Sequence, residues 1–187
     1  GKRLVIATGI NDLLPDIAGF RECWGISVLH CPYCHGYEVS HQRWGVLVSG
    51  EHTLEYVSLL YNWSKDLILF SQVDTVPPDH LEALKRVGVR VVESRVKVVH
   101  HYNGHISRVE TDDGNEYALD ALFSRIPFSQ QGEIAAQAGC ELLPSGHIAV
   151  DQFGKTSATN VFAAGDCCQP MRSVSVAVAS GNMAGAA

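Results

Sequence analysis

The stretch Gly45–Phe70, with the sequence GVLVSGEHTLEYVSLLYNWSKDLILF, contains the pattern that decides the fold. An apolar run ends at Ser49 and Gly50, apolar residues then recur at helical spacing over 53–63, and a second apolar run follows at 67–70. These features predict a strand, a glycine turn, an amphipathic helix and another strand. Such a β-α-β unit is the building block of a doubly wound parallel sheet.

The flanking sequence continues the alternation of strands and helices. Asn103-Gly104 and Asp113-Gly114 are strong signals for tight turns, so the strands around them should form an antiparallel meander inserted after the β-α-β unit. The fold class is therefore expected to be α/β. Further strands are predicted at 4–8, 26–30, 89–92, 95–101, 105–111, 116–123, 147–150 and 160–164, and further helices at 79–87 and 133–138.

Composition and charge exclude several classes of protein. The chain has 187 residues, of which 46% are hydrophobic and 18% charged, as in ordinary globular proteins. Its formal net charge is −6 and it has no lysine- or arginine-rich run, which argues against nucleic acid or an anionic membrane as the main partner. No apolar stretch reaches the roughly 18–20 residues that span a bilayer, and the run that begins at Leu4 is too short for a signal peptide.

Six cysteines are spread over the chain, and two of them form a CxxC motif. Cys31 and Cys34 lie in HCPYCHGYE, residues 30–38. A chain of this length can bury a core without disulfide staples, so a CxxC motif is expected to be redox-active or metal-binding. The other cysteines are expected to pack in the interior: Cys23, Cys140, Cys167 and Cys168.

Two cysteines at this spacing can close a small disulfide ring and pass electrons to another dithiol by exchange. Pro32 fixes one backbone angle inside the ring, and Tyr33 is expected to shield the sulfurs from solvent. If Cys34 opens a helix, the helix dipole and the exposed N–H groups would stabilise its thiolate. Redox use is therefore the favoured interpretation of the motif.

Three other uses of the motif remain open. CxxC followed by His35 is also the attachment pattern of c-type haem, although haem attachment normally accompanies a small helical fold. A zinc site would need two more ligands, from Cys167, Cys168 or the nearby histidines, but neither a second CxxC motif nor a paired-histidine spacing supports it. The pair could also be two ordinary buried cysteines. We expect no metal site.

Three segments, in order, carry a family resemblance. They are Ala7-Thr8-Gly9, the CxxC motif followed about ten residues later by the strand–glycine–helix unit, and TSATNVFAAGD at Thr156–Asp166. Together they resemble the low-molecular-weight thioredoxin reductases, which are FAD-dependent pyridine nucleotide–disulfide oxidoreductases. The resemblance covers essentially the whole chain, and its most specific part is the last segment.

The resemblance implies an FAD site at the two strand ends. Thr8 and Gly9 would border the cofactor, Gly165 would let the backbone approach it, and the Asp166 carboxylate would accept a hydrogen bond from a ribityl hydroxyl. A helix that begins near Val174 would point its N-terminus at the flavin. The resemblance also implies that Cys34 faces the flavin and that Cys31 is the exposed sulfur that exchanges with the substrate.

The family fold implies a Rossmann-like three-layer domain of the FAD/NAD(P)-binding type, with a parallel sheet and an antiparallel β-meander, plus part of a second, FAD-type domain. We expect residues 1–17 to end the first part of the FAD domain. Residues 18–122 should form the NAD(P)-binding-like domain that carries the CxxC motif. Residues 123–187 should form the C-terminal part of the FAD domain.

The turn that should bind NADPH departs from the family pattern. The family has Gly-x-Gly-x-x-Ala, and the matching residues here are VSGEHT, 48–53. Val48 therefore replaces a glycine and Thr53 replaces the alanine. The Val48 side chain is expected to crowd an approaching pyrophosphate, and Glu51 adds a negative charge beside it.

The expected binding site for the 2′-phosphate of NADPH also departs from the family. Ser71–Asp74 contains no arginine, and Arg86 and Arg90 lie further along the sequence. Ser49 and Gly50 remain the candidates for NADP contacts. Whether NADPH is used is left open, and a plain turn kept as scaffold is the alternative.

His35 stands where the family usually has an aspartate after the second cysteine. Cys-His-Gly-Tyr-Glu is similar to a subgroup that includes fungal FAD-dependent dithiol oxidases acting on small epidithiol metabolites. A histidine has a pKa close to neutral, so His35 could deprotonate a dithiol. The alternative is that His35 only caps or packs. Glu38 is expected to be a surface or helix-start carboxylate.

The resemblance leads to one leading function and two alternatives. The leading function is an oxidoreductase like thioredoxin reductase that exchanges electrons between FAD and a dithiol or disulfide through Cys31 and Cys34, with NADPH as a possible donor. The first alternative is an NADPH-independent dithiol oxidase or a ferredoxin-linked relative. The second is a non-catalytic, degenerate nucleotide-binding module.

The expected partners are a thioredoxin-like protein or a small dithiol or disulfide, with a possible homodimer, in the cytoplasm. The family's N-terminal Gly-x-Gly-x-x-Gly turn is not in this sequence, so we expect a fragment. FAD is then the cofactor of the full-length protein. The isolated fragment is expected to be inactive and to bind FAD poorly.

Overall fold

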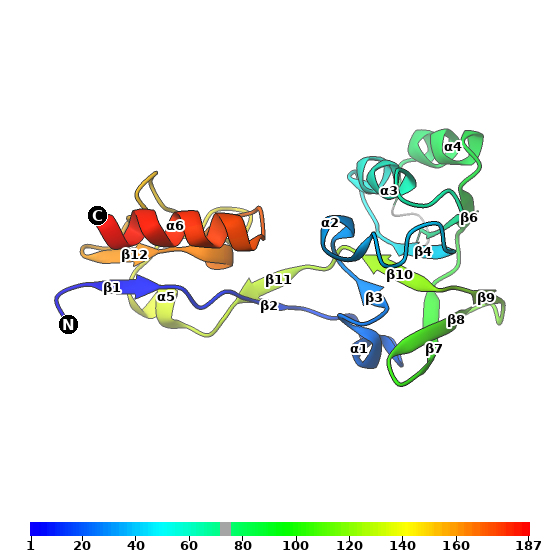
Figure 1. Ribbon diagram of the computed structural model, residues 1–187, viewed down its shortest axis with the longest axis horizontal. Helices are drawn as coiled ribbons and strands as arrows, with labels where there is room; N and C mark the ends of the chain where they lie inside the picture. Colours follow the sequence, from blue (N-terminus) through cyan, green and yellow to red (C-terminus); the bar gives the residue numbers. More distant parts are fainter. Residues whose placement is uncertain (72–75) are drawn as a thin grey trace. The chain divides into compact units, whose positions relative to one another are not determined.

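The computed structural model describes residues 1–71 and 76–187 (Figure 1). The chain divides into two compact units. The central unit is Leu14–Ile126, and the split unit combines Gly1–Leu13 with Pro127–Ala187. The boundaries expected from the sequence, after residues 17 and 122, lie four residues from these.

The central unit is built on a five-stranded parallel sheet with the order β3-β10-β4-β5-β6. The predicted β-α-β unit is confirmed as β4, α3 and β5. The α/β fold class is confirmed as well. The strands are β3 (Val28–Leu29), β10 (Ala121–Ser124), β4 (Trp44–Leu47), β5 (Leu67–Phe70) and β6 (Arg90–Val92). The helices are α1 (Phe20–Cys23), α2 (Pro32–His35), α3 (Thr53–Tyr61) and α4 (Pro78–Arg86).

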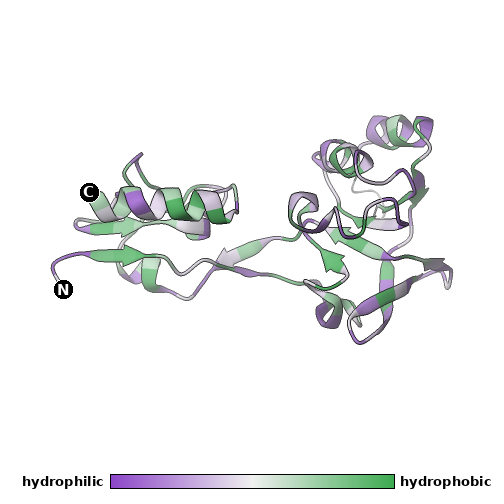
Figure 2. Cartoon of the chain, in the orientation of Figure 1, coloured by the Kyte–Doolittle hydropathy of each residue, from purple (hydrophilic) through white to green (hydrophobic). Residues whose placement is uncertain are grey.

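Alternating strand residues divide the core between the two faces of this sheet, because successive side chains of a strand point to opposite sides. On one face, Val46 and Leu69 pack with Val57 of α3 and Leu84 of α4. On the other face, Phe70 belongs to a cluster with the antiparallel meander. The sheet is therefore the middle layer of three, and Figure 2 shows hydrophobic residues gathered along its strands.

The meander consists of β7 (Val96–Tyr102), β8 (His105–Thr111) and β9 (Glu116–Ala118). The two predicted tight turns connect them, with left-handed backbone at Gly104 and Gly114. One prediction was wrong: 116–123 is not a single strand. The chain leaves the meander at Asp120, whose Oδ2 accepts a hydrogen bond from the Arg43 backbone N–H at 2.9 Å, and β10 then joins the parallel sheet.

A buried hydroxyl connects the meander to the sheet. Ser27 Oγ donates to the Gly104 carbonyl at 2.6 Å and accepts from the Ile106 N–H at 2.9 Å. Ser27→Ala should therefore lower the free energy of unfolding by about 1–3 kcal/mol, because it leaves two buried backbone groups without this partner. Chemical denaturation measures the change. Ser107→Ala, at an exposed hydroxyl of the same meander, is the control and should cost much less; equal losses would contradict the prediction.

The split unit contains two strand pairs and a long C-terminal helix. Strand β1 (Leu4–Ile6) pairs in parallel with β12 (Val161–Ala163), and β2 (Ile10–Asp12) pairs antiparallel with β11 (Phe128–Gln130). The sequence did not predict β2 or β11. The predicted strand at 147–150 is wrong, because this segment makes only isolated bridges. The helices are α5 (Ile134–Gln137), a 3₁₀ turn η1 (Gly165–Cys167) and α6 (Val174–Ala186).

A membrane-spanning helix is not found in the part of the chain that the structure describes. None of its helices combines the length and the apolar character that crossing a bilayer requires.

Candidate functional site

The CxxC motif lies at the carboxyl edge of the parallel sheet. Strand β3 ends at Leu29, and Cys31 then caps the N-terminus of α2 in an extended conformation, with Pro32 in the first turn. The backbone N–H groups of Cys34 and His35 both donate to the Cys31 carbonyl, at 3.2 and 3.3 Å. A strand end followed at once by a one-turn helix therefore fixes the two cysteines.

This edge of the sheet is where open α/β folds bind ligands. From β4 the chain proceeds outward to β5 and β6, and it returns through β10 on the other side of β4. The strand order therefore reverses between β4 and β10, and such a switch point leaves a crevice outside the carboxyl ends. The CxxC motif follows β3, the neighbour of β10.

The family resemblance implies that Cys31 is the more exposed of the two cysteines, and the structure shows the reverse. Cys34 is exposed and Cys31 is half-buried, and both are free thiols. Cys31 rather than Cys34 opens the helix, so the helix-start argument for a Cys34 thiolate is wrong. The hydrogen bond with Cys31, followed by burial, raises the pKa of Cys34 above its ordinary value. Cys34 therefore favours the neutral thiol in this reduced state.

Two aromatic side chains anchor α2. The Tyr33 ring meets the Trp63 ring edge-on, with centroids 6.2 Å apart. Gly36 lies against the Trp63 ring, where a Cβ would come within 3.1 Å of Cδ2. The Gly36 N–H donates to the Pro32 carbonyl at 2.7 Å. The expected shielding of the sulfurs by Tyr33 is wrong, since Tyr33 is itself 74% exposed and Cys34 is exposed. Its ring holds the helix in place.

His35 is the last residue of α2 and is exposed. Its ring makes no hydrogen bond or ion pair with any residue that the structure describes. The ring is therefore not occupied by a capping or packing contact of that kind. Its role as a base stays a prediction.

A cavity of about 230 Å³ opens beside Cys31. The Tyr56 hydroxyl donates to the His30 carbonyl at 2.8 Å, and burial, helped by the nearby Cys31, raises the pKa of Tyr56. The sequence analysis missed Tyr56 and Arg125 here. The signal that could have found Arg125 is its position directly after β10, the strand that pairs in parallel with β3 before Cys31. The lining residues are His30, Cys31, Pro32, Tyr33, Glu55, Tyr56, Leu59 and Arg125.

The turn after β4 has the expected left-handed glycine. Gly50 has φ 83°, and the space where a Cβ would stand is open. Val48, however, is buried among the residues of the sheet and α3, so it does not crowd the outer side of the turn as expected. The Thr53 hydroxyl donates to the Gly50 carbonyl at 2.7 Å. Ser49 is exposed beside it.

Two candidate arginines lie at the wrong edge of the sheet for a 2′-phosphate near that turn. Arg90 begins β6 and pairs with Ile68, and its guanidinium lies 4.9 Å from the Tyr117 ring centroid. Arg86 ends α4, just before β6. Ser71 is buried, and residues 72–74 of the expected phosphate segment lie outside the described residues.

In the split unit, the four expected FAD-contact residues follow neighbouring strand ends. Strands β1 and β12 are parallel and pair Ile6 with Ala163, so Thr8 and Gly9 leave the same edge as Gly165 and Asp166. The two glycines have φ values of 68° and 77°. A Cβ at Gly9 would meet nothing within 4 Å, whereas a Cβ at Gly165 would lie 3.9 Å from the Ala177 Cβ. The Gly165 N–H donates to the Ser180 hydroxyl at 3.0 Å.

These residues fit the flavin role. Asp166 is half-exposed in η1, and a carboxylate there can accept from a hydroxyl. Helix α6 begins at Val174, as the sequence predicts, and the Ser173 hydroxyl caps it by accepting from the Val176 N–H at 3.2 Å. The N-terminus of a helix of this length favours negative charge.

Two adjacent cysteines after Gly165 are packing residues, as expected. Cys167 and Cys168 are buried in the small core of the split unit, and the Cys167 thiol donates to the Ala164 carbonyl at 3.2 Å. The hydrogen bond with Cys167 and burial raise the pKa of Cys168. Cys23 is also fully buried.

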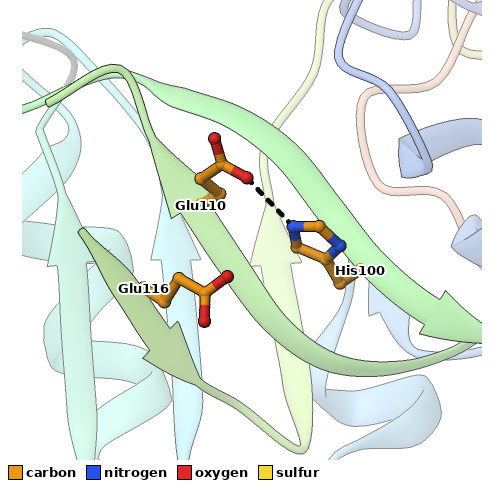
Figure 3. A group of neighbouring side chains, drawn as sticks. All are labelled: His100, Glu110 and Glu116. Atoms are coloured by element: carbon orange, nitrogen blue, oxygen red, sulfur yellow. Dashed lines mark hydrogen bonds and ion pairs between the residues drawn. The ribbon is translucent and has the colours of Figure 1, made fainter. Parts of the chain in front are cut away.

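One group of potential metal ligands lies on the meander (Figure 3). His100 Nε2 and Glu110 Oε2 are 3.2 Å apart, and this hydrogen bond lowers the pKa of Glu110. Lys97 pairs with Glu110 at 3.5 Å, and Arg108 pairs with Glu116 at 2.9 Å. The acidic groups thus have cationic partners, so we interpret the group as an ion-pair network. Among the described residues, no such ligand group contains Cys31 or Cys34.

Residues 1–181 match the family model described as pyridine nucleotide-disulphide oxidoreductase. The chain belongs to the pyridine nucleotide-disulphide oxidoreductase family. Within it, the chain is 30% identical to thioredoxin reductase sirT of Leptosphaeria maculans and 31% identical to thioredoxin reductase tcpT of Claviceps purpurea, each over 99% of this chain. It spans 61% and 60% of the length of these two relatives.

The solved structures agree with this oxidoreductase family. The oxidoreductase from Agrobacterium tumefaciens is 36% identical to the chain, with a TM-score of 0.87 over 98% of this chain and 62% of that one. The resemblance to low-molecular-weight thioredoxin reductases is thereby confirmed, and flavin binding is a general property of such oxidoreductases.

Proposed function

We propose that this pyridine nucleotide-disulphide oxidoreductase exchanges electrons between FAD and a dithiol or disulfide substrate through Cys31 and Cys34. The position of the pair carries the proposal: it lies at the carboxyl edge of a parallel sheet, at the start of a helix and beside a cavity. Family membership supports the flavin.

FAD, when bound, supplies a two-electron acceptor and donor. In this proposal Thr8, Gly9, Gly165 and Asp166 hold it, since they leave one edge of β1 and β12 and the space beside Gly9 is open for close approach. The Asp166 carboxylate accepts a hydrogen bond from a hydroxyl of the cofactor.

The chemistry that the chain performs is thiol–disulfide exchange. Cys31 borders the cavity, so it is the sulfur that a substrate thiolate attacks. Cys34 is then released, and by family analogy it is the sulfur on the flavin side. His35, adjacent to Cys34 and without a hydrogen-bond partner among the described residues, receives the proton of a substrate thiol.

We further propose that a dithiol, rather than NADPH, is the reductant of the flavin. Ser49 and Gly50 could still contact a nucleotide, but Arg86 and Arg90 lie at the opposite edge of the sheet from this turn. Neither of these two arginines can therefore supply the charge-assisted hydrogen bonds that favour a 2′-phosphate at this turn. A dithiol oxidase with Cys31 and Cys34 needs no such site, because the dithiol supplies two electrons to the flavin and oxygen takes them from it.

Anaerobic titration of the FAD-loaded full-length protein tests the proposed electron source. We expect dithiothreitol to remove the absorbance of oxidised flavin and an equal concentration of NADPH to leave it largely unchanged. Faster reduction by NADPH would overturn the dithiol assignment while keeping the flavin role. Flavin that neither reagent reduces would instead favour the non-catalytic module.

A thioredoxin-like protein or a small dithiol is the class of substrate that exchange at Cys31 can serve. The proposed location is the cytoplasm, where reducing conditions keep accessible thiols from forming unwanted disulfides. The homodimer stays a prediction from the family resemblance.

A further inference from the structure

The guanidinium of Arg125 lines the cavity beside Cys31. Arg125 is exposed and makes no ion pair or hydrogen bond with any residue that the structure describes. Its neighbours Ser124 and Ile126 are buried, and the Ser124 hydroxyl donates to the Leu47 carbonyl at 3.1 Å. The backbone that carries Arg125 is therefore held in place, while its guanidinium remains available at the wall of the cavity.

The other walls of this cavity are mainly apolar. Pro32, Leu59 and the Tyr56 ring contribute hydrocarbon surface. The one carboxylate of the lining is Glu55, which is highly exposed and has His52 as a neighbour at 3.7 Å. The volume of about 230 Å³ is below the roughly 300–1,000 Å³ of pockets for drug-sized ligands. The cavity therefore suits a small molecule.

We propose that this cavity is a subsite for a small dithiol or disulfide that carries a carboxylate, with Arg125 as the residue that selects the carboxylate. This inference rests on the proposed function, because it places the sulfurs of that molecule against Cys31. The planar guanidinium offers paired donors that match a carboxylate. The apolar walls would hold the carbon chain between the two ends of the ligand.

The reaction in this subsite is a balanced exchange. A substrate thiolate attacks Cys31 Sγ of the oxidised pair, so a substrate–Cys31 disulfide forms and the Cys31–Cys34 bond breaks. Cys34 leaves as a thiolate and takes up the proton that the substrate thiol released. The second substrate thiolate attacks the substrate sulfur of the mixed disulfide and releases Cys31 as a thiolate, which takes up the proton of the second substrate thiol. The substrate is oxidised by two electrons, and the cysteine pair is reduced by two.

Dihydrolipoate and dihydrolipoamide provide a matched pair of probes, since they share one dithiol and one carbon chain and differ in the carboxylate. The protein with Cys31 and Cys34 oxidised to the disulfide is mixed with each probe. Thiol trapping and mass spectrometry then follow reduction of the pair. This readout needs no flavin turnover. We expect dihydrolipoate to react about three- to tenfold faster at low concentration, the range of one partly exposed charged pair.

The variant Arg125→Gln should lower the rate with dihydrolipoate to about the rate that the same variant shows with dihydrolipoamide, so that the preference for the carboxylate is lost. Arg86→Gln is the control, since it removes the same charge from an exposed position at the opposite edge of the same sheet and should keep the preference. The preference of the wild type should also weaken as salt is added.

The outcomes separate the two proposals. Equal rates for both probes in the wild type, or a preference that survives Arg125→Gln, would overturn the carboxylate subsite and leave the exchange function intact. Failure of both probes and of a reduced thioredoxin-like protein to reduce the Cys31–Cys34 disulfide would overturn the proposed function itself. A thioredoxin-like protein that reacts well while neither small probe does would also overturn the subsite.

Discussion

Replacing Cys31 or Cys34 by serine should lower dithiol–disulfide turnover by roughly 10³-fold or more, the scale of losing a catalytic nucleophile. A serine hydroxyl can neither form the disulfide nor leave as a thiolate. The measurement is the anaerobic rate at which a dithiol reduces the flavin of each variant, made in the FAD-loaded full-length protein. We expect wild-type flavin content with almost no reduction.

The two variants should also differ in what they trap. In Cys34→Ser, the thiol of Cys31 can still attack a disulfide reagent beside the cavity, but no second sulfur resolves the product. A stable adduct on Cys31 should therefore accumulate. Cys140→Ser, in the split unit and half-buried, is the control and should keep full turnover. Retained turnover in either CxxC variant would refute the redox role of the pair.

Gly19→Ala should reduce the free energy of unfolding by about 3–4 kcal/mol, near the upper end for single substitutions. Gly19 has φ 80°, and a Cβ there would overlap the carbonyl oxygen of Val99. The adjacent Ala18 carbonyl accepts from the Val99 N–H at 2.8 Å, so the backbone cannot move aside without breaking the bridge to the meander. Urea denaturation measures the loss.

Gly25→Ala separates overlap from backbone strain in this experiment. Gly25 has nearly the same φ, 78°, but nothing lies within 4 Å of the position of its Cβ. This variant should cost only about 1–2 kcal/mol, the penalty of a left-handed alanine. If Gly19→Ala were no worse than Gly25→Ala, the close contact with Val99 would not limit stability.

Local periodicity explains which parts of the fold the sequence could predict. The apolar runs of β4 and β5 and the helical spacing of α3 are short-range signals, and all three elements were found. The segment 116–123 was misread because its β character is continuous. What separates β9 from β10 is pairing with two different sheets, the meander and the parallel sheet, and only the folded chain specifies that.

The same distinction applies to the candidate site. Cys31 and Cys34 are visible because their spacing is local. Arg125 is distant in sequence, and it reaches the cavity only because β10 inserts beside β3. The orientation of Val48 was also beyond the sequence, since a strand that continues into a turn can place that side chain on either face.

The pairing of β3 with β10 has a consequence for biosynthesis. His30, next to the first redox cysteine, is separated by 94 residues from Ser124 at the end of β10, the strand that β3 pairs with in this sheet. At about 5–20 residues per second, a ribosome needs roughly 5–20 s to cover that distance. During this interval the nascent chain presents both thiols before the sheet that seats them can close, so a reducing environment protects the site from wrong disulfides before it exists.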